Sequence, residues 1–102
     1  EKTHQKVEEY FLSLEAQDET VRFNGANLNQ IRKLKGIKVS EMAEFTRIRQ
    51  TYLNAIEEEN FEVFPSAVYL RGYLYCFIKT LDLPQEKVIR DYMKIYEDLI
   101  RR

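Results

Sequence analysis

Residues 60–81 read NFEVFPSAVYLRGYLYCFIKTL, and this stretch decides how the rest of the chain is organised. From Pro65 onward its apolar residues recur at helical spacing, which predicts an amphipathic helix over 66–81. One face of this helix should lie in the core, and that face carries Ala67, Leu70, Leu74, Phe77, Ile78 and Leu81. A neighbouring stripe consists of Tyr69, Tyr73, Cys76 and Thr80. The apolar arc is therefore wider than one core contact requires, and we predict that something else covers this stripe.

The composition predicts one soluble, all-α domain. The chain has 102 residues, of which 44% are hydrophobic and only 3 are Gly and 2 Pro, so helices are favoured over strands and turns. Its single cysteine fits a reducing compartment, and no apolar run approaches the roughly 18 residues that would span a bilayer. We expect a cytoplasmic domain. Because the chain opens with Glu1 rather than Met, we also expect it to be a fragment of a longer protein.

Apolar periodicity predicts five helices, at about 26–36, 39–45, 49–58, 66–81 and 84–99. Gly36 should end the first of them, residues 46–48 form a tight turn without glycine, and Asp82 is expected to cap the last helix. The domain should occupy residues 23–102. Residues 1–22 are expected to be an acidic leader or linker. They include a short amphipathic pattern, which is typical of a short extra helix and consists of Val7, Tyr10, Phe11 and Leu14.

The charges form a gradient along the chain. Residues 1–22 carry three basic and six acidic side chains, residues 23–64 six and six, and residues 65–102 seven and five. DNA-binding domains usually present a basic patch, since neutralising phosphates supplies much of their affinity. The electrostatic case for DNA binding is therefore weak. The acidic run at 57–59 stands at the end of a predicted helix, where the helix dipole disfavours carboxylates, and we expect it to face solvent.

Three short helices are followed here by an acidic run, two phenylalanines, a proline and the pattern Tyr-Leu-Arg-Gly-Tyr at 69–73. Over residues 23–95 this order resembles the RodZ-like cytoplasmic helix-turn-helix domains, a branch of the XRE/Cro-like superfamily. The resemblance implies a five-helix bundle and a role in bacterial cell shape, in which the fourth helix docks on the bacterial actin MreB. By position, the docking residues would be Tyr69 and Tyr73. It also implies the cytoplasmic part of a single-pass inner-membrane protein.

The tyrosine pair has two interpretations. In the first, Tyr69 and Tyr73 anchor a protein partner, with Cys76 and Thr80 on the same stripe, and Gly72 allows a close backbone approach. In the second, the last helix covers both rings with an apolar stripe of its own. That stripe consists of Val88, Tyr92, Ile95, Tyr96 and Leu99. Arg71, at the edge of the core stripe, is expected to form a structural ion pair.

DNA binding is the alternative function. Many DNA-binding helix-turn-helix domains carry a glutamine near the start of the second helix, where this chain has Val39, which has no donor for a phosphate. The third helix and the turn before it nevertheless offer polar side chains that could reach phosphates and base edges: Arg47, Arg49, Gln50, Thr51 and Asn54. Similar domains also follow other modules such as J-domains, so the parent could be a multidomain regulator.

Enzymatic function has little support in the sequence. His4 is the only histidine, and it lies in the acidic leader, remote in sequence from Cys76. The chain has no clustered spacing of metal ligands, no glycine-rich phosphate loop and no pairing of a nucleophile with a base. We therefore predict a non-catalytic protein without a metal or cofactor.

Overall fold

The computed structural model describes residues 23–100, which form five α-helices and one short 3-10 helix. The elements are α2 (Gly25–Leu34), α3 (Val39–Thr46), α4 (Gln50–Glu58), η1 (Phe61–Val63), α5 (Ala67–Thr80) and α6 (Gln85–Ile100). No strand occurs between residues 23 and 100. The predicted all-α, five-helix fold is confirmed, and each predicted boundary lies within two residues of the observed one. The predicted leader helix lies outside the described residues.

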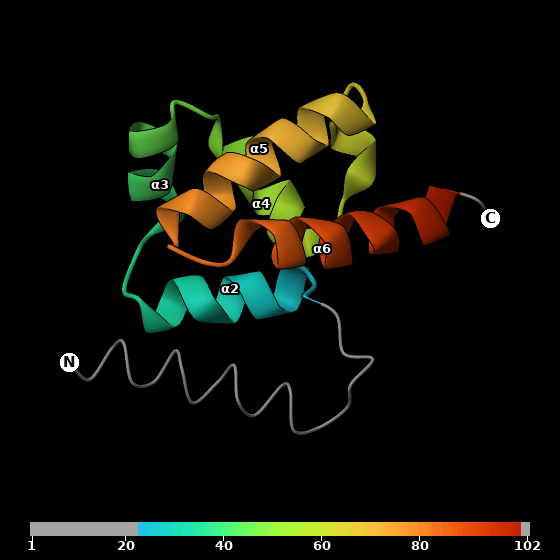
Figure 1. Cartoon of the computed structure of the whole chain (residues 1–102). Helices are drawn as coiled ribbons and strands as arrows, with labels where there is room; N and C mark the ends of the chain where they lie inside the picture. Colours follow the sequence, from blue (N-terminus) through green and yellow to red (C-terminus); the bar gives the residue numbers. More distant parts are fainter. Residues whose placement is uncertain (1–22, 101–102) are drawn as a thin grey trace.

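Helix α4 lies at the centre of the bundle and contacts α2, α3, η1 and α5. Helix α6 packs on α5, and in Figure 1 these two helices lie in front of α4, with α2 below them. The short connection between α3 and α4 brings α3 onto both α4 and α5. This arrangement leaves one side of α5 and the start of α4 open to solvent.

Every helix contributes apolar side chains to one continuous core. The predicted core face of α5 is confirmed, since Leu70, Leu74, Phe77, Ile78 and Leu81 have no exposed surface, although Ala67 is only partly buried. Helix α6 contributes Val88 and Tyr92, both fully buried. Full burial of a single side chain of this kind stabilises a protein by roughly 1.5–3 kcal/mol, so the shared core holds together helices that are too short to be stable alone.

Helices α2, α3, α4 and α5 are each followed within two residues by a left-handed residue, and only one of these four residues is glycine. Gly36, at φ 71°, ends α2 as predicted: its N–H donates to Lys33 O at 3.0 Å, and the N–H of Ile37 donates to Arg32 O at 3.2 Å. Asp82, at φ 57°, ends α5 in the same way, with its N–H donating to Lys79 O. The prediction that Asp82 caps the last helix is wrong, because the backbone of Asp82 ends α5, and α6 begins only at Gln85. The first backbone bond of α6 is accepted by Pro84 O.

The acidic run at 57–59 is mostly structural, so the prediction that it faces solvent is wrong for two of its three residues. The Glu57 carboxylate, 6% exposed, accepts hydrogen bonds from Arg32 Nε, Arg32 Nη2 and Asn29 Nδ2. Glu59 Oε2 accepts the N–H of Gly25 at 2.9 Å. This N–H belongs to the first turn of α2, where the helix dipole favours an anion. Only Glu58 is exposed.

Tyr92 joins α6 to α4 through a buried hydrogen bond, its hydroxyl donating to Ile56 O at 2.6 Å. Burial raises the pKa of this hydroxyl far above its ordinary value of 10.0, and the negative charge of Glu59 adds to the rise. The folded state therefore holds Tyr92 neutral, whereas the same group ionises in the unfolded chain. Its contribution to stability is complete below pH about 10 and is lost as the pH rises further.

We expect Tyr92→Phe to lower the free energy of unfolding by about 1–2 kcal/mol at pH 7, because a buried carbonyl loses its donor. Above pH about 10 the wild type should lose stability more steeply than the variant, by up to roughly 1.4 kcal/mol per pH unit. Urea denaturation of both proteins between pH 7 and 11 measures this difference. Parallel curves above pH 10 would show that Tyr92 is not protected from ionisation.

Candidate functional site

Four aromatic rings form a connected cluster where α4 meets the start of α5. The ring centroids lie 4.8 Å apart for Tyr52 and Tyr73, 5.7 Å for Tyr52 and Phe64, and 6.2 Å for Tyr69 and Tyr73. These separations are typical of favourable aromatic pairs. Exposure increases outward, from Phe64 at 8% through the half-buried Tyr52 and Tyr73 to Tyr69 at 51%. We call these four residues the aromatic platform.

Local sequence explains how the platform forms. Pro65 disfavours a helical backbone at the residue before it, and Phe64 is accordingly extended, at φ −86° and ψ 134°. The chain turns there, so that the Phe64 ring enters the core and α5 begins at Ala67. Because Tyr69 and Tyr73 lie one helical turn apart on α5, their rings are neighbours.

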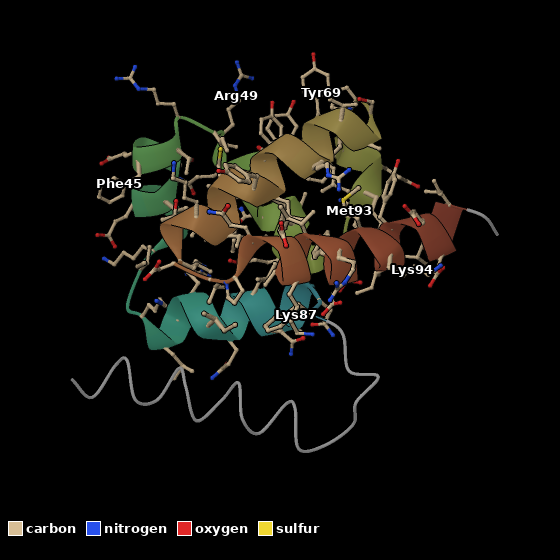
Figure 2. All side chains as sticks on the ribbon, in the orientation of Figure 1. Phe45, Arg49, Tyr69, Lys87, Met93 and Lys94 are labelled. Carbon is tan, nitrogen blue, oxygen red and sulfur yellow. The ribbon has the colours of Figure 1, made fainter. Side chains whose placement is uncertain are left out.

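The last helix does not cover the tyrosine pair. The rings in contact with Tyr73 belong to α4, to α5 itself and to the segment before α5, whereas Tyr92 and Tyr96 of α6 pair with Phe61 at 5.9 and 5.2 Å. The interpretation in which α6 covers both rings is therefore wrong. The structure also separates the two tyrosines, since Tyr73 supports the platform from within and Tyr69 projects from it (Figure 2).

Gly72 lies on the exposed surface of α5. A Cβ atom added there would meet nothing within 4 Å, so the predicted close approach of a partner backbone to Gly72 stays a prediction. A close approach within the fold occurs at Gly25, where a Cβ would lie 2.3 Å from Glu57 O. Val68, at 78% exposure, stands one turn before Gly72 and beside Tyr69. Val68, Tyr69 and Gly72 thus form an exposed patch, of which Val68 was not predicted.

Cys76 and Thr80 occupy a different place from the tyrosines. Thr80 Oγ1 donates to Cys76 O at 2.9 Å, and both residues line a shallow pocket between α3 and α5. Phe45 of α3 lines the same pocket and is 80% exposed. Figure 2 shows it on the outer side of α3. The predicted stripe therefore divides into an aromatic half and a pocket half. Phe45 was not predicted, because it lies three residues after the buried Met42, a spacing that places both residues on one helical face.

The proposed DNA-contacting residues are all exposed at the start of α4 and in the turn before it: Arg47, Arg49, Gln50, Thr51 and Asn54. Arg47 takes a left-handed conformation at φ 60°, which replaces the glycine often found in such turns. Arg49 points to the same side of the molecule as Tyr69 (Figure 2). Val39 is half-buried against the core. Within residues 23–100 the basic and acidic side chains balance, so this group of polar residues lies on a part of the chain without net formal charge.

Arg71 does not form the predicted structural ion pair. Its side chain is exposed, and it has no ion pair within the described part of the chain. In that same part, no three histidine, cysteine, aspartate or glutamate side chains are placed to hold a metal ion. None of the helices between residues 23 and 100 is long and apolar enough to cross a membrane.

Comparison with known proteins identifies the architecture. A family model described as a helix-turn-helix domain matches residues 27–88, which is more than half of the chain and extends from α2 through α5 into α6. The match includes the whole aromatic platform, so α5 belongs to the family's common unit. No solved structure matched the chain. With its three short helices followed by α5 and α6, the chain belongs to the helix-turn-helix domain family.

Proposed function

We propose that this domain is a non-catalytic protein-docking module, which binds its partner through the first half of α5. The observation that carries the proposal is Tyr69, a large aromatic side chain that is 51% exposed although it rests on Tyr73. Exposed apolar residues scattered singly need no explanation, but here Val68 and Gly72 extend the same patch. The patch therefore has the composition of an interface centre.

The aromatic platform restricts the Tyr69 side chain before a partner binds. Its ring rests on Tyr73, which is held in turn by Tyr52 and Phe64, so little side-chain freedom remains to be lost when a partner arrives. A tyrosine combines a large apolar area with a hydroxyl for a polar partner, which explains its enrichment at interface hot spots. Gly72 destabilises an exposed helix without any packing gain inside the domain. A close approach by a partner backbone would explain its presence.

The resemblance to RodZ-like domains supplies the partner class. In that branch the fourth helix of the domain binds the bacterial actin MreB, and here the fourth α-helix described is α5. We therefore propose that a bacterial actin of the MreB class docks on Val68, Tyr69 and Gly72, in a parent protein that is anchored in the inner membrane. Cys76 and Thr80 lie further along α5 and would belong to the edge of this interface.

Tyr69→Ala should weaken binding to the bacterial actin at least tenfold, since truncating a central tyrosine costs about 2 kcal/mol of binding. The melting temperature should change by only a few degrees, because half of the side chain is already in solvent. Titration calorimetry and thermal denaturation measure the two effects. Tyr75→Ala is the matched control: Tyr75 is 42% exposed on the same helix, but it faces a groove against α6.

Unchanged affinity of Tyr69→Ala, or an equal loss for Tyr75→Ala, would contradict the proposal. Tyr73→Ala provides a second comparison. Because Tyr73 contacts three other rings, this variant should lower both stability and partner affinity, whereas Tyr69→Ala lowers affinity alone. The pair of variants thus separates the supporting residue from the contacting one.

DNA binding is a second candidate, favoured by the exposure of Arg47, Arg49 and Gln50 at the start of α4. We expect this affinity to be weak and unselective, at most micromolar in fluorescence anisotropy with random duplexes, and to disappear with added salt. The reasons are the balanced charge of residues 23–100 and the lack of a donor at Val39. A selected operator bound at nanomolar affinity in physiological salt would instead establish the domain as a transcriptional regulator.

A further inference from the structure

Basic side chains without nearby acidic ones are concentrated in the part of the fold that carries the tyrosine patch. Residues 45–56 reach from the end of α3 through most of α4, residues 64–80 include α5, and the two segments pack on each other. Together they carry four basic and no acidic side chains, whereas the rest of residues 23–100 carries seven basic and eleven acidic ones. The balanced total charge thus divides into a basic region and an acidic remainder. The four cations of the basic region are Arg47, Arg49, Arg71 and Lys79.

All four cations are exposed, and none of them has an ion pair within residues 23–100. The ion pairs of that part of the chain belong to other basic residues, namely Arg32, Lys87, Arg90 and Lys94. The basic region therefore has no internal counter-charge. Its field is available to steer a partner of opposite charge toward the patch.

Arg49 lies beside the aromatic platform. It stands one turn before Tyr52, whose N–H donates to Arg49 O at 3.0 Å and whose ring lies 4.8 Å from that of Tyr73. Tyr73 in turn supports Tyr69. Figure 2 shows the side chains of Arg49 and Tyr69 projecting on the same side of the molecule. A partner that covers Tyr69 would therefore meet the Arg49 guanidinium at one edge of the contact.

Lys79 lies at the opposite end of the patch. It follows Gly72 by seven residues and Val68 by eleven, so the three residues share one face of α5. Along the helix axis Lys79 is about 10 Å beyond Gly72. A standard protein interface covers about 800 Å² on each partner, which corresponds to a patch roughly 30 Å across. Such an interface, centred on Tyr69 and Gly72, would include both cations in its rim.

We propose that the partner that docks on this patch presents an acidic surface to it, an inference that rests on the proposed docking function. Carboxylates of the partner lie opposite Arg49 and Lys79, around an apolar pocket that takes Tyr69. An apolar centre with a charged rim is the usual anatomy of a protein interface. Duplex DNA fits less well, because it offers few apolar atoms to cover Val68 and Tyr69, whereas an acidic protein surface satisfies both the cations and the apolar patch.

Association kinetics with a bacterial actin of the MreB class test this inference, measured by biolayer interferometry at about 50 and about 500 mM salt. At the lower salt, Arg49→Glu and Lys79→Glu should each slow association at least threefold, and the double variant at least tenfold, because rim charges act mainly on the association rate. The screening length is about threefold shorter at the higher salt, where wild type and variants should agree within about twofold. Tyr69→Ala should instead speed dissociation at both salt concentrations.

Lys33→Glu is the matched control, because Lys33 is exposed on α2 without an ion pair in residues 23–100 and its reversal changes the net charge equally. It should alter the association rate by less than about twofold. Arg49→Lys keeps the charge and should associate like the wild type. Should the acid introduced by Lys79→Glu near the end of α5 unfold the chain, Lys79→Gln takes its place, with an expected slowing of about twofold.

Three results would overturn the acidic partner surface. An association rate that responds neither to salt nor to Arg49→Glu and Lys79→Glu, while Tyr69→Ala still weakens binding, would leave the docking function standing without it. Equal slowing by Lys33→Glu would show a general effect of net charge. Slowing by the same variants that occurs only with random duplex DNA would assign the cations to nucleic acid. A wild-type chain that does not bind the actin at all would overturn the docking function together with this inference.

Discussion

Glu57→Ala is expected to lower the free energy of unfolding by about 3–5 kcal/mol, because it leaves the buried guanidinium of Arg32 without its carboxylate. Arg32 is 9% exposed, and its other described hydrogen bond, from Nη1 to Ile37 O at 2.8 Å, does not compensate a full charge. The total free energy of unfolding of a small domain is roughly 5–15 kcal/mol, so the variant should be close to unfolding at 37 °C. Urea denaturation at pH 7 measures the loss.

The neighbouring Glu58→Ala provides the matched control. Glu58 belongs to the same acidic run but is exposed, and its removal should change stability by less than about 0.5 kcal/mol. Arg32→Ala should lower the free energy of unfolding by about as much as Glu57→Ala. The double variant should lower it by less than the sum of the two single effects, since neither charge then remains buried without its partner. Equal effects of Glu57→Ala and Glu58→Ala would contradict the buried pair.

Gly25→Ala is expected to destabilise the domain by about 3 kcal/mol, at the upper end of the usual range for overpacking. The added Cβ would lie 2.3 Å from Glu57 O and 2.7 Å from Ile56 O, both of which belong to the backbone of α4. Helices α2 and α4 would have to move apart, which would also disturb the contact between Gly25 N–H and Glu59. Thermal denaturation followed by circular dichroism measures the loss.

Gly72→Ala is the control for Gly25→Ala, and it is expected to raise the free energy of unfolding instead of lowering it. Nothing lies within 4 Å of a Cβ at Gly72, and alanine in a helix interior stabilises the helix by about 0.5–1 kcal/mol relative to glycine. The variant should therefore be more stable than the wild type and, if a partner approaches Gly72 closely, bind that partner less well. A stable Gly25→Ala variant would show that α2 and α4 do not pack as closely as described.

The sequence predicted the helices because their apolar periodicity is strong and their ends are marked. The five segments, the turn at Gly36 and the core face of α5 follow from local patterns, and all three agree with the structure. Asp82 was assigned to the wrong helix because an aspartate between two helices can cap the second or end the first. A left-handed aspartate is uncommon, and nothing in the local sequence indicates it.

Contacts between helices could not be predicted in this way. The acidic run seemed misplaced at the end of α4, but Glu59 lies against the start of α2, whose dipole favours it, and Glu57 lies against Arg32. In the same way, the sequence does not indicate that the backbone of α4 comes close to Gly25, because that contact depends on the tertiary fold. One sequence position alone does not tell which helix will approach it.

The candidate site was predicted in part. Spacing alone identified Tyr69 and Tyr73 as neighbours on a stripe separate from the core. It could not separate their roles, because that depends on Tyr52 and Phe64, which reach Tyr73 only through the tertiary fold. For the same reason the stripe could not be seen to divide at Cys76, where α3 brings in Phe45.

Hydrogen exchange of the chain with and without a bacterial actin of the MreB class tests the proposed docking surface most directly. Peptides that cover Val68, Tyr69 and Gly72 should become more protected when the actin is added, and those from the outer face of α6 should not. The Tyr69→Ala variant at the same actin concentration should lose most of this protection. Protection confined to the start of α4, around Arg49 and Gln50, or no protection on α5 at saturating actin, would contradict the account.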